Sequence, residues 1–385
     1  MRIYYQSFIN TAIFDSSCKI YYLLVTHNKY IKSFIDFLYK AKHSYSIYSF
    51  CLVMKQNKEL SIQNDVKLDL KDKKLLFELD FNARMPYSLL AKKVGLSKQG
   101  AEYKVNNLIK KSVIKGFYPV INVPKLGYKY CRLLVTIQNT TKTKEQEIVD
   151  YLIKNSKVFW LFKLHGVYDF LIVIWVKELS EFREFREDLL SQFSGHIKKA
   201  IENIMTDVIH YQHRWILGNE ATKEIHLKET SEFVQMDETD KKIIGILSEN
   251  ARSSLVDISK KVGESAKVVG NRIKKLEEKK IIEGYRPVIN HNIIGYTYYK
   301  VFINLNKISK EELKKLKVNI KYNPLVIYLV EGIALPGDLD IEIMVKNNQQ
   351  LYKFIEELRF KFPTIIGDYQ TVTFIDTLKV KYFPF

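Results

Sequence analysis

Residues 82–128 read NARMPYSLLAKKVGLSKQGAEYKVNNLIKKSVIKGFYPVINVPKLGY, and residues 250–296 read NARSSLVDISKKVGESAKVVGNRIKKLEEKKIIEGYRPVINHNIIGY. Each residue of the second stretch lies 168 positions after its partner in the first, without a gap. When the comparison starts at Asp69 and Asp237, 23 of 60 aligned positions are identical, far more than unrelated segments share. The period is too long for the unit of a solenoid, so the sequence predicts two copies of a whole module.

The first part of each copy has the pattern of three short helices. The leucines of residues 75–79 recur at helical spacing, and a second apolar period of the same kind follows. Gly95 is placed to end that second helix in a left-handed conformation, and Ser97 is placed to cap a third. Gly263 and Ser265 hold the same positions in the second copy. Three helices joined by a tight glycine turn predict a helix-turn-helix.

The rest of each copy is rich in β-forming residues. VIKGFYPVIN and IIEGYRPVIN, which follow the third helices, predict a two-stranded wing in each copy. Beyond them, apolar periods of strand and helix length follow the order βαββαβ, over residues 130–211 and again over residues 298–382. That order is typical of a ferredoxin-like sandwich. The predicted class is therefore α+β, a winged helix-turn-helix plus a ferredoxin-like domain, repeated twice.

Domain boundaries follow from this pattern. Residues 1–53 resemble nothing that comes later, and our hypothesis is that an upstream in-frame start adds them as an N-terminal extension that is not native to the working protein. Residues 218–233 are polar and lack a hydrophobic period, which favours a linker. The remaining boundaries are 66–127 and 234–295 for the two winged helix-turn-helix domains, and 128–217 and 296–385 for the two ferredoxin-like effector and assembly domains.

Composition points to a polyanionic partner. The chain of 385 residues has 61 lysine and arginine residues against 43 aspartate and glutamate residues, a formal net charge of +18. Such a balance favours nucleic acid, which binds cationic proteins through phosphate neutralisation and counterion release. The alternative explanation is a lysine-rich proteome from an AT-rich genome, because the sequence is rich in Tyr, Ile and Asn as well.

Several kinds of protein are disfavoured by what the sequence lacks. Cys18, Cys51 and Cys131 have neither the pairing of a disulfide framework nor metal-ligand spacing. No apolar run reaches the roughly 18 residues that a bilayer span needs. We found no glycine-rich phosphate loop and no nucleophile motif. We therefore expect a cytoplasmic protein with no membrane segment, no metal, no cofactor and no catalytic residues.

The duplicated module resembles the leucine-responsive/asparagine regulator family (Lrp/AsnC) of transcription factors. The resemblance rests on Asn82-Ala83-Arg84, Lys93-Val94-Gly95-Leu96-Ser97 and Leu126-Gly127-Tyr128, and it covers about residues 68–382 as two fused copies. It implies a DNA-binding head, an effector and assembly domain, and a small-molecule effector such as an amino acid. Family members pair their effector domains as dimers, so this fused chain is expected to form its own pseudo-dimer, with higher homo-oligomers left open.

The resemblance also implies where an effector would bind. The Gly-x-Tyr-Asp turn of the family is present as Gly166-Val167-Tyr168-Asp169, whereas the second copy keeps only Gly337-Asp338. The expected effector-binding residues are therefore Gly166, Tyr168, Asp169, Gly337 and Asp338.

Double-stranded DNA is the expected partner of the two third helices, because the third helix of a helix-turn-helix head enters the major groove. Gln99 and Asn271 have the amide geometry that reads adenine, whereas lysines more often bind phosphate or guanine. Arg84 and Arg252 open the second helices, where they are expected either at phosphate or, equally, in a solvated cap or a structural hydrogen bond. Arg286 and Lys115 in the wings are weaker phosphate candidates. The full expected set is Arg84, Ser97, Lys98, Gln99, Tyr103, Lys104, Asn106, Arg252, Ser265, Lys267, Asn271, Arg272, Lys274 and Lys275.

Two other functions fit the same pattern. A scaffold that binds protein through its winged helices would show the same polar helix faces. Some haem-biosynthetic decarboxylases of the sirohaem type resemble this two-domain fold and are enzymes, although nothing in the sequence singles out a porphyrin site. The favoured function is a sequence-specific transcriptional regulator without enzyme activity.

Overall fold

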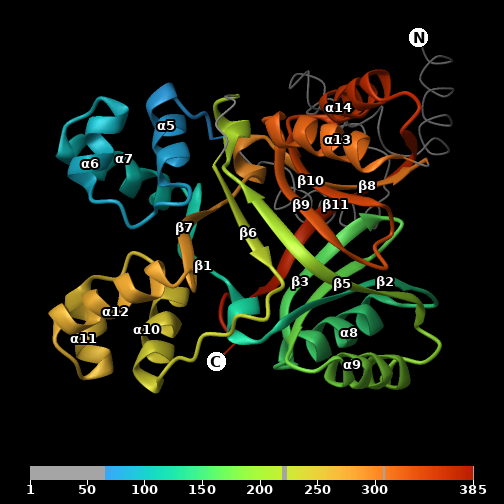
Figure 1. Cartoon of the computed structure of the whole chain (residues 1–385), viewed down its shortest axis with the longest axis horizontal. Helices are drawn as coiled ribbons and strands as arrows, with labels where there is room; N and C mark the ends of the chain where they lie inside the picture. The colour runs from blue at the N-terminus through green and yellow to red at the C-terminus, as the bar shows by residue number, and fades with distance from the viewer. Residues whose placement is uncertain (1–65, 219–222, 307, 385) are drawn as a thin grey trace, which may run out of the picture. The chain divides into compact units, whose positions relative to one another are not determined.

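The computed structural model describes residues 66–218, 223–306 and 308–384. The predicted N-terminal extension, residues 1–53, lies outside these ranges. Residues 65–385 form one unit, in which two helical heads adjoin a β-barrel (Figure 1). Over the described ranges, none of the helices is both long and apolar enough to cross a membrane.

Each copy of the repeat forms a head of three helices, as predicted. The Ser97 hydroxyl accepts a hydrogen bond from the Gly100 backbone N–H and so caps the third helix of head 1. Gly95 ends the second helix with a φ of +67°, a left-handed value that glycine adopts without strain. The helices are α5 (Leu70–Leu79), α6 (Tyr87–Val94) and α7 (Lys98–Lys110) in head 1, and α10 (Glu238–Glu249), α11 (Leu255–Val262) and α12 (Ala266–Glu278) in head 2.

The predicted two-stranded wings do not form. Each head contributes a single strand, β1 (Ile114–Ile121) or β7 (Ile282–Ile289), and these two strands pair with one another in antiparallel orientation. We call this pair the cross-head ribbon. Short 3-10 helices, η1 (Val123–Leu126) and η3 (Asn292–Ile294), then lead into the barrel. The wing prediction is wrong because a strand pattern shows that a partner strand is needed but not which copy supplies it.

Each half then continues in the predicted order βαββαβ. Its four strands are arranged as in a ferredoxin-like sandwich, β5-β2-β4-β3 in the first half and β11-β8-β10-β9 in the second. The elements of the first half are β2 (Lys129–Ile137), α8 (Lys142–Lys154), β3 (Val158–Gly166), β4 (Phe170–Val176), α9 (Leu179–Gln192) and β5 (Ile197–Tyr211). Those of the second half are β8 (Thr297–Leu305), α13 (Lys310–Tyr322), β9 (Val326–Ile333), β10 (Leu339–Val345), α14 (Asn348–Lys361) and β11 (Ile366–Val380).

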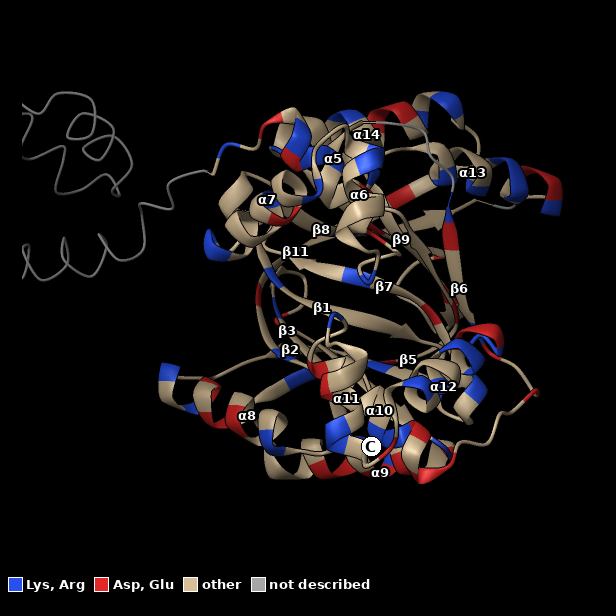
Figure 2. Cartoon of the chain, turned by 90° about the vertical axis from the view of Figure 1, so that its left-hand side faces the viewer, with Lys and Arg blue, Asp and Glu red and all other residues tan. Residues whose placement is uncertain are grey.

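The two ferredoxin-like sheets close into one barrel. β5 and β11 are each 15 residues long. The first part of each pairs with its own half, and a later part pairs with the outer strand of the other half, as β5–β9 and β11–β3. Eight strands therefore form a closed circuit, which removes the exposed edges that two separate sheets would have. Helices α8, α9, α13 and α14 cover the outside of the barrel (Figure 2).

The predicted linker, residues 218–233, contains a strand. Residues Glu224–Lys228 form β6, which pairs antiparallel with Asp207–Tyr211 at the end of β5. The side chains of Ile225 and Leu227 are buried in the same core as the barrel interior. The linker prediction is wrong for these residues because two apolar side chains in a polar segment are too few to give a recognisable period.

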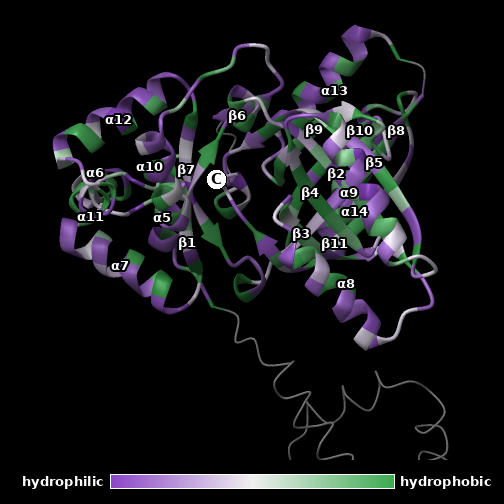
Figure 3. Ribbon diagram, turned by 90° about the horizontal axis from the view of Figure 1, so that it is seen from below, coloured by the Kyte–Doolittle hydropathy of each residue, from purple (hydrophilic) through white to green (hydrophobic). Residues whose placement is uncertain are grey.

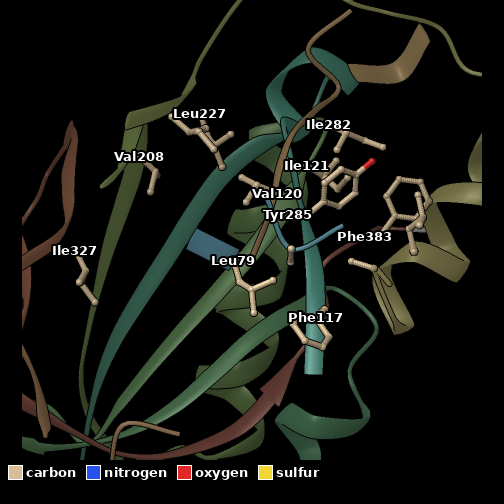
Figure 4. Packing of buried hydrophobic residues seen from close by; sticks show 14 of the residues in the cluster. Leu79, Phe117, Val120, Ile121, Val208, Leu227, Ile282, Tyr285, Ile327 and Phe383 are labelled. Carbon is tan, nitrogen blue, oxygen red and sulfur yellow. The ribbon is translucent and has the colours of Figure 1, made fainter. Parts of the chain in front are cut away.

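One hydrophobic cluster runs from the heads into the barrel. Figure 4 shows Phe117 and Tyr285 of the cross-head ribbon in the same cluster as Leu79 of head 1 and as Val208 and Ile327 of the barrel. Two further clusters lie between the barrel strands and their covering helices, one in each half. Because the shared cluster is continuous, separating the heads from the barrel would expose apolar surface to water.

A buried ion pair lies where the two heads meet the barrel. Arg286 of β7 donates from Nε to Oδ1 of Asp80 over 2.7 Å and from Nη2 to Oδ2 over 3.1 Å. Both side chains are fully buried. The Asp80 carboxylate also accepts from the His213 backbone N–H, and Arg286 also donates to the Tyr211 carbonyl. The expectation that Arg286 contacts phosphate is therefore wrong.

Two buried histidines adjoin this ion pair. Nδ1 of His210 lies 3.3 Å from Nη1 of Arg286 and must accept, because a guanidinium only donates. Burial, with the charge of Arg286 acting in the same direction, holds the pKa of His210 well below its ordinary value. Burial lowers the pKa of His213 to about 3, although Asp80 opposes this shift. Both rings are therefore neutral in the fold at neutral pH.

We predict that acid destabilises the fold through His213. Its pKa is about 3 in the folded state and about 6.5 in an unfolded chain. Unfolding therefore takes up a proton between these values, and stability falls as the pH drops through that window. One such histidine changes the free energy of unfolding by about 1.4 kcal/mol per pH unit. Urea unfolding at several pH values between neutral pH and about pH 4 measures this effect. The free energy of unfolding should fall less steeply with decreasing pH for His213→Gln than for the unchanged chain.

His226→Gln is a control of opposite sign. The ring of His226 donates a hydrogen bond to the Asp207 carboxylate, which raises the pKa of His226, so this exposed histidine stabilises the fold below its unfolded pKa and loses that effect as the pH rises. Removing His226 should therefore make the free energy of unfolding fall more steeply as the pH is lowered. Equal slopes for the unchanged chain and His213→Gln would contradict the assignment of His213 as a buried neutral group.

Candidate nucleic-acid interface

The third helix of each head buries one face and leaves the other open. Ala101, Val105 and Leu108 of α7 pack into head 1. The equivalent residues of α12, which are Val269, Ile273 and Leu276, pack into head 2. The Ser265 hydroxyl accepts from the Val268 backbone N–H and caps α12, as Ser97 caps α7. Each N-terminus is therefore fixed in place, and its positive dipole end favours anions nearby.

Eight of the expected DNA-binding side chains lie on these open faces. Tyr103 is the most exposed large hydrophobic side chain on α7, with 72% of its surface accessible. Neither helix is buried against the barrel (Figure 1, Figure 2). The exposed set is Lys98, Gln99, Tyr103 and Asn106 on α7, and Lys267, Asn271, Lys274 and Lys275 on α12.

The two open faces differ at every one of these positions. The repeat places Gln99 opposite Lys267, Tyr103 opposite Asn271, and Asn106 opposite Lys274. Amides, tyrosine and lysine present different hydrogen-bond donors and acceptors to a groove. Two identical half-sites would therefore not suit both helices equally.

Lys104 and Arg272 lie at equivalent positions and point back to the first helix of their head. Lys104 pairs with Asp69 over 2.7 Å and with Asp72 over 2.9 Å. Arg272 repeats this arrangement in head 2, with the equivalent aspartates at 2.7 and 2.8 Å. The hydrogen bond from Lys104 lowers the pKa of Asp69. These two cations fix the third helix to the first, which differs from the DNA contact expected from the sequence.

Arg84 and Arg252 also lie away from the position expected for a phosphate contact. Arg84 donates to the backbone carbonyl of Ala251 in head 2, and Arg252 donates to that of Ala83 in head 1. The guanidinium of Arg252 lies 4.5 Å from the ring centroid of Tyr87, within the range of a cation–π contact. We call these reciprocal bonds the arginine clasp, because they join one head to the other. These bonds agree with the alternative expectation of a structural hydrogen bond, but the sequence could not show that the acceptor lies in the other head, 167 residues away for Arg84.

The heads are basic, but unequally so. Residues 65–128 hold 13 lysine and arginine residues against six acidic ones, and residues 233–296 hold 12 against nine. Figure 2 shows lysine and arginine on helices of both heads. Figure 3 places α7 and α12 at opposite outer edges of the joined heads. A duplex that met both helices would therefore cross the whole width of the head pair.

Further cations of the second helices complete this surface. Lys92 of α6 and Lys260 of α11 are identical in the two copies and exposed. The second helix of a helix-turn-helix head crosses the phosphate backbone, so these lysines are placed for phosphate. Neither lysine is among the DNA-binding residues expected from the sequence, although their identity in both copies is a signal that points to them.

The expected effector residues have structural partners. Oδ2 of Asp169 accepts from the Ile137 backbone N–H over 2.8 Å, and Oδ2 of Asp338 accepts from the Leu305 N–H over 2.6 Å. The Tyr168 ring is buried and makes an edge contact with a phenylalanine of the other half. Gly166 and Gly337 lie so close to neighbouring backbone that a Cβ would meet it at 2.9 Å. These five residues therefore shape the turns before β4 and β10.

Models of known protein families match both heads. The model of the AsnC-type helix-turn-helix domain matches residues 236–277, and that of a winged helix-turn-helix DNA-binding domain matches residues 68–115. The HTH-type transcriptional regulator FL11 of Pyrococcus horikoshii is 32% identical over 125 residues, which are 32% of this chain and 80% of that protein. The chain belongs to the Lrp/AsnC family.

Other relatives of this Lrp/AsnC chain match a similar length. The transcriptional regulator AzlB of Bacillus subtilis is 26% identical over 145 residues, which are 37% of this chain and 89% of that protein. Among solved structures, that of the siroheme decarboxylase NirDL has a TM-score of 0.54 at 13% identity and covers 82% of this chain and 94% of that one. This last likeness shows a shared fold over both halves, and at such low identity it shows the fold alone.

We predict that the exposed lysines of α12 bind DNA. Changing Lys274 and Lys275 together to alanine should weaken binding of duplex DNA and reduce the slope of log affinity against log salt by about two, since each phosphate contact contributes about 0.9. Fluorescence anisotropy at several salt concentrations measures both quantities.

Two lysines that are neighbours in the sequence, on a helix that covers the barrel, give the matched control. Lys314 and Lys315 of α13 are exposed as well and lie outside the heads. Changing both to alanine removes the same charge and should leave the salt slope unaltered. Equal effects of the two double variants would show that net charge, rather than α12, binds the DNA.

Proposed function

We propose that the protein is a sequence-specific DNA-binding transcriptional regulator whose single chain supplies both reading heads. One observation carries this proposal: two third helices with different exposed side chains belong to heads that are joined by the pairing of β1 with β7. Membership of the Lrp/AsnC family supports it further. We place such a regulator in the cytoplasm, where bacterial or archaeal DNA is found.

Direct contacts in the major groove would give the sequence preference. Gln99 and Asn271 each offer one donor and one acceptor, the pattern that suits the N6 and N7 edge of adenine. Lys267 and Lys274 suit guanine or phosphate. Tyr103 is exposed on α7 and offers a hydroxyl and an apolar ring edge. Because head 1 and head 2 carry different members of this set, the operator should consist of two unlike half-sites.

A small-molecule effector, such as an amino acid, is the second part of the proposal. A cavity of about 340 Å³ adjoins the turn that holds Asp338, and Thr206, Lys317 and Glu331 also line it. Lys317 and Glu331 pair with each other over 2.6 Å, and an amino acid would have to replace this pair, with its carboxylate on Lys317 and its ammonium on Glu331. Isothermal titration with individual amino acids tests this part, and the absence of heat with all of them would remove it.

Selection of bound sequences from random duplex DNA tests the regulator directly. The full chain should enrich a non-palindromic site with two half-sites about one helical turn apart, or a multiple of it. Footprinting and native mass spectrometry should then show one chain on each site. Enrichment of a perfect palindrome that binds two chains, or no enrichment at all, would contradict the proposal.

A second candidate function rests on the fold likeness to a siroheme decarboxylase over both halves. An enzyme of that class would bind an iron tetrapyrrole and remove carboxylate groups from it. Sirohaem added to the purified chain would then change its visible spectrum on binding, and mass spectrometry would detect loss of carbon dioxide from the ligand. A regulator should show neither change and should bind its selected DNA site with steep salt dependence.

A further inference from the structure

The two halves of the chain differ at the positions where they meet inside the barrel. Arg132 of β2 and Lys300 of β8 hold equivalent positions, 168 residues apart. On the neighbouring strand of its own half, Lys300 lies opposite Glu342, whereas Arg132 lies opposite Val173. Asp340 has Leu171 as its equivalent by the same strand register. The second half therefore holds two acids in the barrel interior where the first half holds two aliphatic residues.

The first half takes its counter-ion from the second. Nη1 of Arg132 lies 2.6 Å from Oδ2 of Asp340, and both side chains are almost fully buried. Nζ of Lys300 lies 2.6 Å from Asp340 and 2.6 Å from Glu342. Nε of Arg132 also donates to Oδ1 of Asn203 over 2.9 Å. Two cations and two anions thus balance, and only the pairing of unlike halves brings them together.

The two heads also differ at the equivalent positions where they meet each other. The buried pair of Asp80 and Arg286 joins head 1 to head 2. The equivalent positions on the other side of the repeat are Ser248 and Tyr118. They carry no charge, and the Ser248 hydroxyl is buried without a hydrogen-bond partner. One side of the head pair therefore has an ion pair that the other side lacks.

Pairing of like halves would leave charges buried and unmatched. Two first halves would bring two Arg132 side chains together without an acid, and would place Asp80 against Tyr118. Two second halves would place Arg286 against Ser248, and would hold four acids against two Lys300 side chains. A buried charge without its partner is strongly destabilising, which is how unlike charges specify one pairing over another.

We propose that the two halves of this chain are heterospecific: each accepts the other half as its partner and excludes a second copy of itself. The partner of each half is therefore the complementary half, from its own chain or, by reciprocal exchange, from another. This inference concerns the pairing of the protein and does not rest on the proposed function in DNA binding.

A nicked protein tests the pairing. A protease site inserted between Gly218 and Lys223 allows the folded full chain to be cut into its two halves, which have different masses. The cut protein is unfolded in urea, refolded by dilution and weighed by native mass spectrometry. Pairs of unlike halves should exceed pairs of like halves by at least about a hundredfold. A random mixture, in which about half of the pairs join like halves, would overturn the proposal.

A variant made alike in both halves is the matched comparison. It carries Arg132→Leu, Lys300→Leu, Asp340→Leu, Glu342→Val, Asp80→Ser and Arg286→Tyr, so the contacting positions of the two halves become the same or nearly so. Replacement of buried ion pairs by apolar groups is often neutral or stabilising. Asp80→Ser and Arg286→Tyr copy the uncharged residues that the fold already holds at the equivalent positions of the other copy, so this variant should fold. The cut variant should give the random mixture. If it still pairs only unlike halves, the ion pairs are not the source of selectivity.

The uncut chain gives an independent reading. Asp340→Leu alone leaves the buried Arg132 without its counter-ion, and it should lower the ratio of folded to unfolded protein by roughly a hundredfold or more. Adding Arg132→Leu should restore most of that loss, because Lys300 keeps Glu342 as its partner. A double variant no more stable than Asp340→Leu would contradict the charge argument.

Discussion

The antiparallel pairing of β1 with β7 is the constraint on which the rest of the arrangement depends. Two further backbone bonds extend it, from the Ala83 N–H to the Tyr285 carbonyl and from the Ala251 N–H to the Phe117 carbonyl, each 2.9 Å long. Separation of the two strands would leave backbone donors and acceptors unpaired within an apolar cluster, which is costly. The two heads therefore form one body, and the separation of α7 and α12 is fixed by the fold rather than by a tether.

The ribbon also joins the heads to the barrel. Arg286 lies on β7, yet its surroundings come from head 1 through Asp80 and from the barrel through His210, Tyr211 and Tyr328. A single buried guanidinium thus touches all three parts of the unit. Because the equivalent position in the first copy is a tyrosine, this junction exists on one side only. The two copies share one fold, and their differences at a few buried positions make them complementary.

The sequence predicted the elements better than it predicted their partners. Gly95 and Ser97 identify the turn and the cap of the third helix because both act within a few residues. The pairing of β1 with β7 and the roles of Arg84 and Lys104 depend on neighbours distant in the sequence, and a periodic pattern shows which face is buried but not against what. The linker prediction fails over Glu224–Lys228 for another reason: the partner strand β5 directly precedes them, but two apolar side chains in a polar segment give no recognisable strand period.

The joined heads hold two unlike helices, α7 and α12, at one fixed separation. This separation can be measured with a spacing series of the selected DNA site, in which five or ten base pairs are inserted between the half-sites, about half a turn and one whole turn of the duplex. Both insertions should reduce the affinity to that of a single half-site, because joined heads cannot follow either change. Full affinity for the site with ten inserted base pairs would show that the heads move independently and that their separation is not fixed.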